Sequence, residues 1–129
     1  MFSPVKAIGS VAACMALLLT GPAALAQSSY PSKTITLVLP FAAGSGTDTT
    51  TRLIAAKLSG ALGQSVVVDN KPGANGMLAA TFVARAAPDG YTLFVTTNTT
   101  HSANPSLMKQ LTYDPVKDFT PIARTGNLP

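Results

Sequence analysis

The amino-acid sequence predicts an α/β fold in which helices cover a parallel β-sheet. Segments rich in β-branched and apolar residues alternate with segments whose apolar residues recur at helical spacing. The connections between these segments are short, so helical crossovers must join strands that run parallel. We therefore expect the order strand, helix, strand, helix, strand along the chain, with the first strand lying between the other two in the sheet.

The first strand is predicted over residues 34–39, where β-branched and apolar residues run up to Pro40. The first helix is predicted over residues 48–62, with Asp48 in its first turn and Gly63 as its C-cap. The apolar positions of this helix, which we expect to face the sheet, are Leu53, Ile54, Leu58, Ala61 and Leu62.

The second strand is predicted over residues 65–69, and its run of valines indicates burial on both faces. A loop over residues 70–76 follows this strand. The second helix is predicted over residues 77–87, because Pro88-Asp89-Gly90 would end it. Its apolar side is expected to comprise Leu78, Ala79, Phe82, Val83 and Ala86.

The third strand is predicted over residues 91–95. A polar run over residues 96–104 follows, then a short helix near residues 105–110 and an irregular tail. In open α/β sheets, ligands bind beyond the carboxyl ends of strands where the chain reverses direction across the sheet. Loops 40–48 and 96–104 occupy that position, whereas loop 70–76 follows an edge strand and is expected to be structural.

The first of these loops suits an anion. Glycines let the backbone approach a ligand closely, and free N–H groups at the start of the next helix carry the positive end of its dipole. The same residues would also serve a plain strand-to-helix turn in which Asp48 acts as a cap or dipole partner, and both interpretations stay open. The predicted ligand-binding residues here are Phe41, Ala42, Ala43, Gly44, Ser45, Gly46, Thr47 and Asp48.

The second loop offers hydroxyls, amides and an imidazole, which are suited to polar oxygens. Such segments also form ordinary solvated turns that cap a following helix. His101 is the only histidine and has no cysteine or glutamate neighbours, so we expect it to cap or hydrogen-bond and predict no metal site and no cofactor. The predicted ligand-binding residues here are Thr97, Asn98, Thr99, His101 and Asn104.

Residues 1–26 have the pattern of a signal peptide for export. A basic start precedes an apolar run over residues 7–19, and Ala24-Leu25-Ala26 offers a cleavage site. The run is too short for the roughly 20 apolar residues of a spanning helix. A lipoprotein signal ending at Cys14 is the alternative, but few apolar residues would then precede the cysteine. We expect a mature chain over residues 27–129 with no later membrane segment.

The composition argues against thiol chemistry and against nucleic-acid binding. Cys14 is the only cysteine, so cleavage would remove every thiol that could form a disulfide, act as a nucleophile or bind a metal. The net charge of +4 is not clustered, and it lacks the basic stripe with interleaved aromatic residues of a nucleic-acid surface. Residues 27–129 are enough for one small domain and too few for two.

An enzyme is the main alternative, because Gly44-Ser45-Gly46 follows a strand as in dinucleotide loops and nucleophile elbows. However, Thr49 stands where the dinucleotide fingerprint needs glycine. Ala43 and Thr47 stand where the elbow needs glycines. The chain has no glutamate, and its one histidine lies on another loop, so we predict no catalytic residues.

Several motifs follow one another at a characteristic spacing. They are Tyr30-Pro31-Ser32-Lys33, Pro40 to Asp48, Asn70 to Gly76, Ala87-Pro88-Asp89-Gly90-Tyr91, Thr97 to Leu107, and Tyr113 to Phe119. Over residues 30–125 the sequence resembles the Bug family, the periplasmic solute receptors of tripartite tricarboxylate transporters.

The resemblance implies a two-lobed periplasmic binding protein, type II-like, which closes on a small carboxylate. It implies a monomer that works in the periplasm with the membrane components of a transporter. Family members hold the ligand carboxylate between the loops that correspond to residues 41–48 and 97–104, partly through backbone groups and bridging water. Ser45 stands where the family often has another glycine, which narrows the backbone conformations allowed there.

Family members are more than twice as long as this chain. We therefore expect residues 27–129 to form the N-terminal part of the first lobe, with the second lobe absent. A sheet without its later strands would expose apolar surface and an unpaired edge. Such an incomplete lobe is expected to fold marginally and to bind weakly or not at all, and a truncated, non-functional remnant is the alternative.

Overall fold

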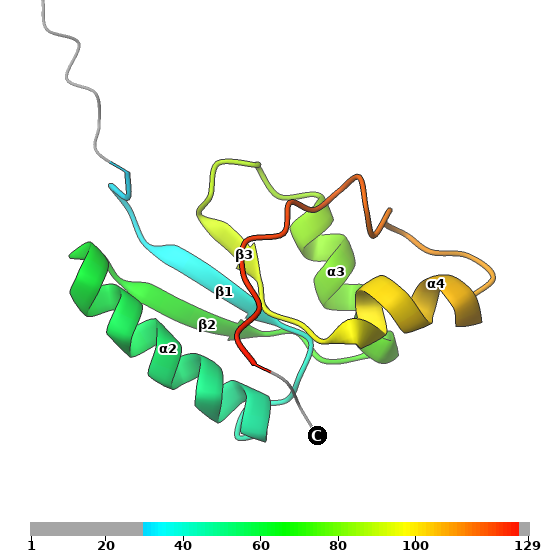
Figure 1. Cartoon of the computed structure of the whole chain (residues 1–129), viewed down its shortest axis with the longest axis horizontal. Helices are drawn as coiled ribbons and strands as arrows, with labels where there is room; N and C mark the ends of the chain where they lie inside the picture. The colour runs from blue at the N-terminus through cyan, green and yellow to red at the C-terminus, as the bar shows by residue number, and fades with distance from the viewer. Residues whose placement is uncertain (1–29, 127–129) are drawn as a thin grey trace, which may run out of the picture.

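The computed structural model of the chain describes residues 30–126, so the predicted signal peptide over residues 1–26 lies outside the described residues. The predicted α/β class is confirmed, because helices pack on a parallel three-stranded sheet (Figure 1). In chain order the elements are β1 (Ile35–Leu39), α2 (Gly46–Leu62), β2 (Val66–Asn70), the 3-10 turn η2 (Ala74–Gly76), α3 (Met77–Ala84), β3 (Thr92–Phe94), the π-helical turn η3 (Thr99–Ala103) and α4 (Asn104–Leu107).

The strand order is β2-β1-β3, as the sequence predicts. Both pairings are parallel, and Leu37 at the centre of β1 aligns with Val68 on one side and Leu93 on the other. The pairing continues past the carboxyl ends of the strands, where Lys71 N donates to Leu39 O at 2.7 Å and Val95 N donates to Val38 O at 3.0 Å. All three strands therefore end at the same edge of the sheet.

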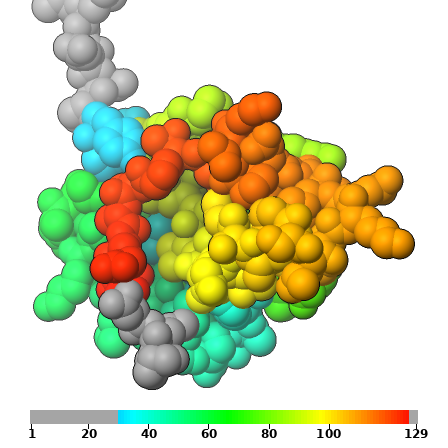
Figure 2. All heavy atoms as spheres, turned by 45° about the vertical axis from the view of Figure 1, so that its right-hand side comes forward, coloured from blue at the N-terminus to red at the C-terminus, as the bar shows by residue number. Residues whose placement is uncertain are grey.

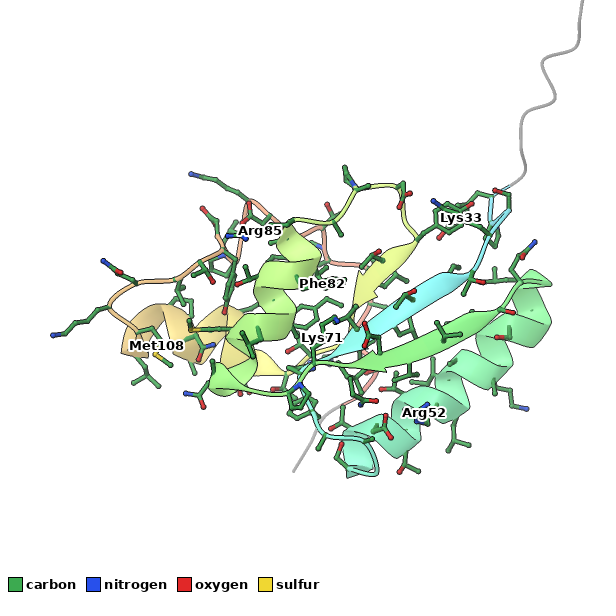
Figure 3. All side chains as sticks on the ribbon, turned by 180° about the vertical axis from the view of Figure 1, so that it is seen from behind. Lys33, Arg52, Lys71, Phe82, Arg85 and Met108 are labelled. Atoms are coloured by element: carbon green, nitrogen blue, oxygen red, sulfur yellow. The ribbon has the colours of Figure 1, made fainter. Side chains whose placement is uncertain are left out.

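The core lies between the sheet and α2. Side chains alternate along a strand, so Ile35 and Leu37 share one face of β1, where they are buried against Ala55 of α2. The flanking positions of β2 and β3 complete this layer, and they include Val68 and Leu93. Helix α3 contacts β1 and β3 on the opposite face (Figures 1 and 3). Each helix thus covers one face of the sheet.

Helix α2 begins two residues earlier than predicted. Ser45 is its N-cap and accepts a hydrogen bond at Oγ from Asp48 N at 3.2 Å. The predicted C-cap is confirmed, because Gly63 adopts a left-handed conformation with φ 64° and donates to Ser59 O at 3.0 Å. Both ends of the helix are therefore closed by local groups.

The predicted apolar face of α2 is wrong in part. The buried positions are Asp48, Thr51 and Ala55, whose spacing follows one side of the helix, and their small size lets the helix approach the sheet closely. Leu53 is 67% exposed, because its two-residue offset from Thr51 turns it about 200° around the axis. Apolar character alone did not identify the buried side of this helix.

The predicted burial of the second strand on both faces is also wrong. Val67 is 46% exposed, whereas its neighbours Val66 and Val68 point to the face that α2 covers. Helix α3 runs over β1 and β3. The other face of the edge strand β2 is therefore left partly open, and Val67 lies on it.

Helix α3 ends at Ala84, earlier than predicted, and its expected apolar side is divided. Ala79 and Ala80 are fully buried, whereas Leu78 and Phe82 are 59% and 46% exposed. These two exposed side chains border an apolar hollow of about 540 Å³, which is also lined by Ala74, Met77, Thr81, Arg85, Ala86 and Thr112. Lys71 Nζ lies 4.3 Å from the centroid of the Phe82 ring, beside this hollow (Figure 3).

The polar run over residues 96–104 is not the open loop that was expected. Residues Thr99–Ala103 form the π-helical turn η3, which continues directly into α4. Pro105 lacks an N–H, and its ring crowds the carbonyl one turn earlier, so a regular α-helical turn cannot run through it. A wide turn accommodates such an interruption. The short helix starts at Asn104 and ends at Leu107, before the predicted end at residue 110.

The first described residues form hydrogen bonds and an ion pair with the turn before β3. Tyr30 Oη donates to Gly90 O at 2.7 Å, and Ser32 N donates to Tyr91 Oη at 2.8 Å. Lys33 Nζ forms an ion pair with the Asp89 carboxylate at 3.0 Å. Within residues 30–126, no helix is both long and apolar enough to cross a bilayer.

Replacing Gly76 with alanine is expected to destabilise the fold. Gly76 has φ +82°, and an added Cβ would lie 2.7 Å from Thr100 Cγ2 and 3.1 Å from Pro40 Cβ, both of which belong to buried residues. Left-handed strain and crowding together predict a loss of roughly 2–4 kcal/mol in the free energy of unfolding, measured by urea denaturation. Gly60→Ala is the matched control, because it lies within α2 and its added Cβ would meet nothing within 4 Å. This control should stabilise the chain by about 0.5–1 kcal/mol, and equal unfolding midpoints for the two variants would contradict the prediction.

Candidate functional site

The loops that follow the three strands lie side by side at the carboxyl edge of the sheet (Figure 1). Pro40 begins the loop after β1, Gly76 ends the loop after β2, and Thr100 lies in η3 after β3. Gly76 packs against both Pro40 and Thr100, and all three residues are buried. Loop 70–76, which was expected to be structural, packs through Gly76 against both loops that were predicted to bind a ligand.

The buried side chain of Asp48 is hydrogen-bonded to the backbone of the first loop. The residue is only 3% exposed, and its Oδ2 accepts hydrogen bonds from Gly44 N at 2.9 Å and from Arg52 Nε at 3.0 Å. Its Oδ1 accepts a hydrogen bond from Asn70 Nδ2 at 2.9 Å. Both carboxylate oxygens are therefore engaged within the protein, which favours the interpretation of Asp48 as a structural partner over that of a ligand contact.

Asn70 joins the loop after β1 to the end of β2. Its Nδ2 donates to Phe41 O at 3.0 Å as well as to Asp48, and its Oδ1 accepts from Arg52 Nη2 at 3.0 Å. The Arg52 guanidinium thus spans two acceptors on different segments of the chain. We call Asp48, Arg52 and Asn70 the loop-clamp residues, because together they contact the beginning, middle and end of the first loop.

These contacts stabilise the charged form of Asp48. Hydrogen bonds from the Arg52 side chain, the Gly44 backbone and the Asn70 side chain lower the pKa of Asp48 to about 2, against the opposing effect of burial. At neutral pH the carboxylate is ionised, and it is paired with a single guanidinium.

The exposed side of the first loop consists mainly of backbone. Ala42, Ala43, Gly44 and Gly46 are exposed. In the described part of the chain, the N–H groups of Gly46 and Thr47 donate no hydrogen bond, as expected for the first residues of a helix. These N–H groups carry the positive end of the dipole of a 17-residue helix, so this part of the loop can hold a carboxylate or another small anion.

Two members of the second loop are buried and hold it in place. Asn104 is 1% exposed, and its Nδ2 donates to Asn75 O at 3.0 Å and to Tyr113 Oη at 3.4 Å. Thr100 is equally buried, and its carbonyl oxygen accepts a hydrogen bond from Tyr113 Oη at 2.6 Å. The predicted residue Asn104 therefore bonds within the protein, and Tyr113 of the irregular tail anchors the turn from the other side.

His101 packs among aromatic rings. Its ring centroid lies 4.7 Å from that of Phe119 and 6.0 Å from that of Phe94. Its Nδ1 is 2.8 Å from Thr100 Oγ1, and burial lowers the pKa of His101 below its usual value. This environment agrees with the hydrogen-bonding role expected for His101 and leaves the imidazole neutral at pH 7.

The remaining predicted residues of the second loop lie at or near the surface. Asn98 is exposed, whereas Thr97 and Thr99 are half-buried and their hydroxyl oxygens lie 3.2 Å apart. Figure 2 shows the surface hollowed between this part of the chain, in yellow, and the segment near residue 120, in red. Within residues 30–126, no group of three or more histidine, cysteine or acidic residues could hold a metal ion.

The structure thus divides most of the predicted residues into two groups. Asp48 and Asn104 are buried and bonded internally, whereas the backbone of residues 42–47 and the side chains of residues 97–99 border solvent. Phe41 and His101 belong to neither, because the Phe41 carbonyl accepts from Asn70 and His101 packs among aromatic rings. The sequence prediction missed Arg52 and Asn70. A local pattern could have identified Arg52, because it lies four residues after Asp48 on a helix, whereas the contact of Asn70 with Phe41 joins segments 29 residues apart.

Comparison with known proteins gives a consistent result. A sequence profile of the family described as tripartite tricarboxylate transporter family receptor matches residues 50–129. A UPF0065 protein of Bordetella bronchiseptica is 47% identical over 113 residues, which cover 88% of this chain and 33% of that protein. Protein BugT of Bordetella pertussis is 35% identical over 108 residues, which cover 83% of this chain and 33% of BugT. The chain therefore spans about a third of the length of these curated relatives.

Solved structures share the fold of the described segment. MatC from Rhodopseudomonas palustris, solved with bound malate, matches with 52% identity and a TM-score of 0.67 over 71% of this chain and 31% of MatC. A second R. palustris protein, solved with adipate, matches with 44% identity and a TM-score of 0.64 over 67% of this chain and 29% of that protein. The periplasmic binding protein BugD matches with 44% identity and a TM-score of 0.68 over 72% of this chain and 31% of BugD. The predicted fold, part of a periplasmic binding protein, is confirmed.

Acid should weaken the fold through Asp48. The pKa of Asp48 is about 2 in the folded chain, against an ordinary value of 3.8, so ionisation of this group stabilises the folded form. That contribution is complete above the unfolded value and is lost as the pH falls towards the folded one. Thermal unfolding midpoints measured between about pH 2 and pH 5 should therefore fall more steeply for the wild-type chain than for Asp48→Asn.

Asp69→Asn serves as the control for this measurement. Asp69 pairs on the surface with Lys71 at 3.1 Å, and surface ion pairs contribute little to stability. This variant should follow the wild-type profile. A profile for Asp48→Asn that is parallel to the wild type would show that the contacts of Asp48 do not stabilise the folded chain.

Proposed function

Because this chain belongs to the receptor family of tripartite tricarboxylate transporters, we propose that it forms part of an extracytoplasmic solute receptor that binds the carboxylate of a small organic acid. The observation that carries the proposal is the exposed backbone at the start of α2. There the N–H groups of Gly46 and Thr47 are free among the described residues, while the Asp48 carboxylate is turned inward.

A carboxylate is the favoured ligand group for two reasons. Backbone N–H groups at a helix N-terminus favour negative charge, and their spacing suits the oxygens of a small anion. Two solved relatives from R. palustris carry malate and adipate, both of which are dicarboxylates. The hydroxyls of Thr97 and Thr99 and the amide of Asn98 border the same edge and would donate hydrogen bonds to the carboxylate oxygens of the ligand.

The place of action and the partners follow from the family. We propose that the chain is exported by cleavage after residue 26 and acts in the periplasm as the ligand-binding part of a monomeric receptor. It would deliver its ligand to the membrane components of a tripartite tricarboxylate transporter. The family is one of solute-binding receptors, so the proposed role is binding and not catalysis.

The role of the Gly46 N–H can be tested by removing it. Gly46→Pro takes away this donor at the first helical position, which proline favours, and Ser45 already has the extended conformation that a following proline requires, with φ −67° and ψ 160°. Gly46→Ala adds a Cβ that meets nothing within 4 Å and keeps the N–H. Loss of one hydrogen bond to a charged group predicts roughly tenfold weaker binding for Gly46→Pro than for Gly46→Ala.

The measurement is a titration of the chain with malate, succinate and adipate, followed through the backbone amide signals by NMR, which also detects weak binding. Saturable shifts at Gly46 and Thr47 in the wild-type chain would support the proposal. Thermal unfolding of both variants ensures that a loss of binding does not reflect a loss of fold. The proposal fails if the two variants bind equally well. Amides that do not respond to any of the three acids would show that this segment alone does not hold a carboxylate.

A further inference from the structure

A buried carboxylate beside an anion-binding loop would repel the anion. Asp48 is 3% exposed and accepts a hydrogen bond from Gly44 N, so its negative charge lies directly behind the backbone that would face the ligand. Two like charges at short range repel, and the repulsion is larger where water is excluded. The loop therefore needs a positive charge that offsets Asp48.

Arg52 supplies that charge. Its Nε lies 3.0 Å from Asp48 Oδ2, and within residues 30–126 this is the only ion pair that Asp48 makes. The side chain of Arg52 is half exposed on the side of α2, one helical turn after Asp48 (Figure 3). Lys71, Lys33 and Lys117 pair with other carboxylates, so none of them offsets Asp48 by direct contact.

The geometry requires an arginine and not merely a positive charge. Nε bonds to Asp48 while Nη2 bonds to Asn70 Oδ1, so one rigid planar group spans two acceptors. Asn70 is held in turn so that its Nδ2 reaches both Asp48 Oδ1 and Phe41 O. A lysine, with its single nitrogen, could keep the charge but could not orient Asn70 in the same way.

We propose that Arg52 and Asn70 are positioning residues of the carboxylate site, which fix the first loop and cancel the charge of Asp48 so that the loop attracts an anion. This inference rests on the proposed function. Arg52 acts through its two protein partners, because its Nε donates to the Asp48 carboxylate and its Nη2 donates to Asn70 Oδ1. Asn70 acts through the Phe41 carbonyl and the Asp48 carboxylate.

The test compares two variants that each remove one positive charge from α2. Arg52→Gln removes the partner of Asp48, whereas Lys57→Gln removes an exposed charge that makes no ion pair within the described residues. Malate and adipate affinities are measured by NMR titration at low and high salt. Arg52→Gln should bind about threefold to tenfold more weakly than Lys57→Gln at low salt, with a smaller difference at high salt.

A double variant separates the proposed role from direct contact with the ligand. In Asp48→Asn/Arg52→Gln the unpaired negative charge is absent, so affinity should recover in part from the Arg52→Gln value. Arg52→Lys should fall between the wild type and Arg52→Gln. The proposal is overturned if Arg52→Gln binds like Lys57→Gln, or if the double variant binds no better than Arg52→Gln, because Arg52 would then have no role or would contact the ligand itself.

A second readout keeps this inference independent of ligand binding. The Gly44 N–H bonds to Asp48, so its hydrogen-exchange rate reports on the loop whether or not a ligand binds. Arg52→Gln and Asn70→Ala should speed the exchange of this amide by several-fold, and Lys57→Gln should not. If the wild-type chain binds no carboxylate, this segment does not hold the ligand alone, and the exchange rates still test the positioning role. If the exchange of Gly44 is unchanged in both variants, the positioning role fails.

Discussion

Parallel pairing of β1 with a strand on each side is the constraint on which the rest of the structure depends. It places the carboxyl ends of three strands at one edge, and each strand then continues into a loop that must turn back over that edge. The crossover helices lie on opposite faces, because the connection from β1 to β2 and the connection from β2 to β3 run across the sheet in opposite directions and both crossovers keep the same hand. The contacts among Pro40, Gly76 and Thr100 follow from this arrangement, since three loops share a narrow space.

Side-chain hydrogen bonds hold the first loop in place and still leave backbone N–H groups at the start of α2 without a partner in the described chain. Side-chain acceptors hold the inner surface of the loop through Ser45 and Asp48, while the N–H groups of Gly46 and Thr47 stay free on the outer surface of the described chain. Holding the loop requires side-chain acceptors, and binding an anion would require free backbone N–H groups. The sequence places these two kinds of group at adjacent positions. A rigid set of donors loses little conformational entropy when a ligand binds, so these hydrogen bonds would support affinity at the proposed site without contacting the ligand.

The strand order, the cap at Gly63 and the two loops at the sheet edge could be predicted, because each depends on local pattern or on the handedness of crossovers. The exposed positions of Leu53, Leu78 and Phe82 could not. An apolar side chain favours burial, but only the packed arrangement determines which side of a helix meets the sheet. Asn70 was missed for a related reason, since its partner Phe41 lies 29 residues earlier and no local pattern reports that contact.

The fastening of the first described residues has a consequence for the proposed export. Tyr30 and Ser32 bond to residues about 60 positions later, and β1 obtains its second partner only when β3 is present. A chain that emerges from a membrane channel with its N-terminus first cannot close these contacts until most of the segment has passed through. Non-local contacts of this kind slow folding, because the loop must close before any contact rewards it. The topology thus leaves β1 without its second partner until β3 is present.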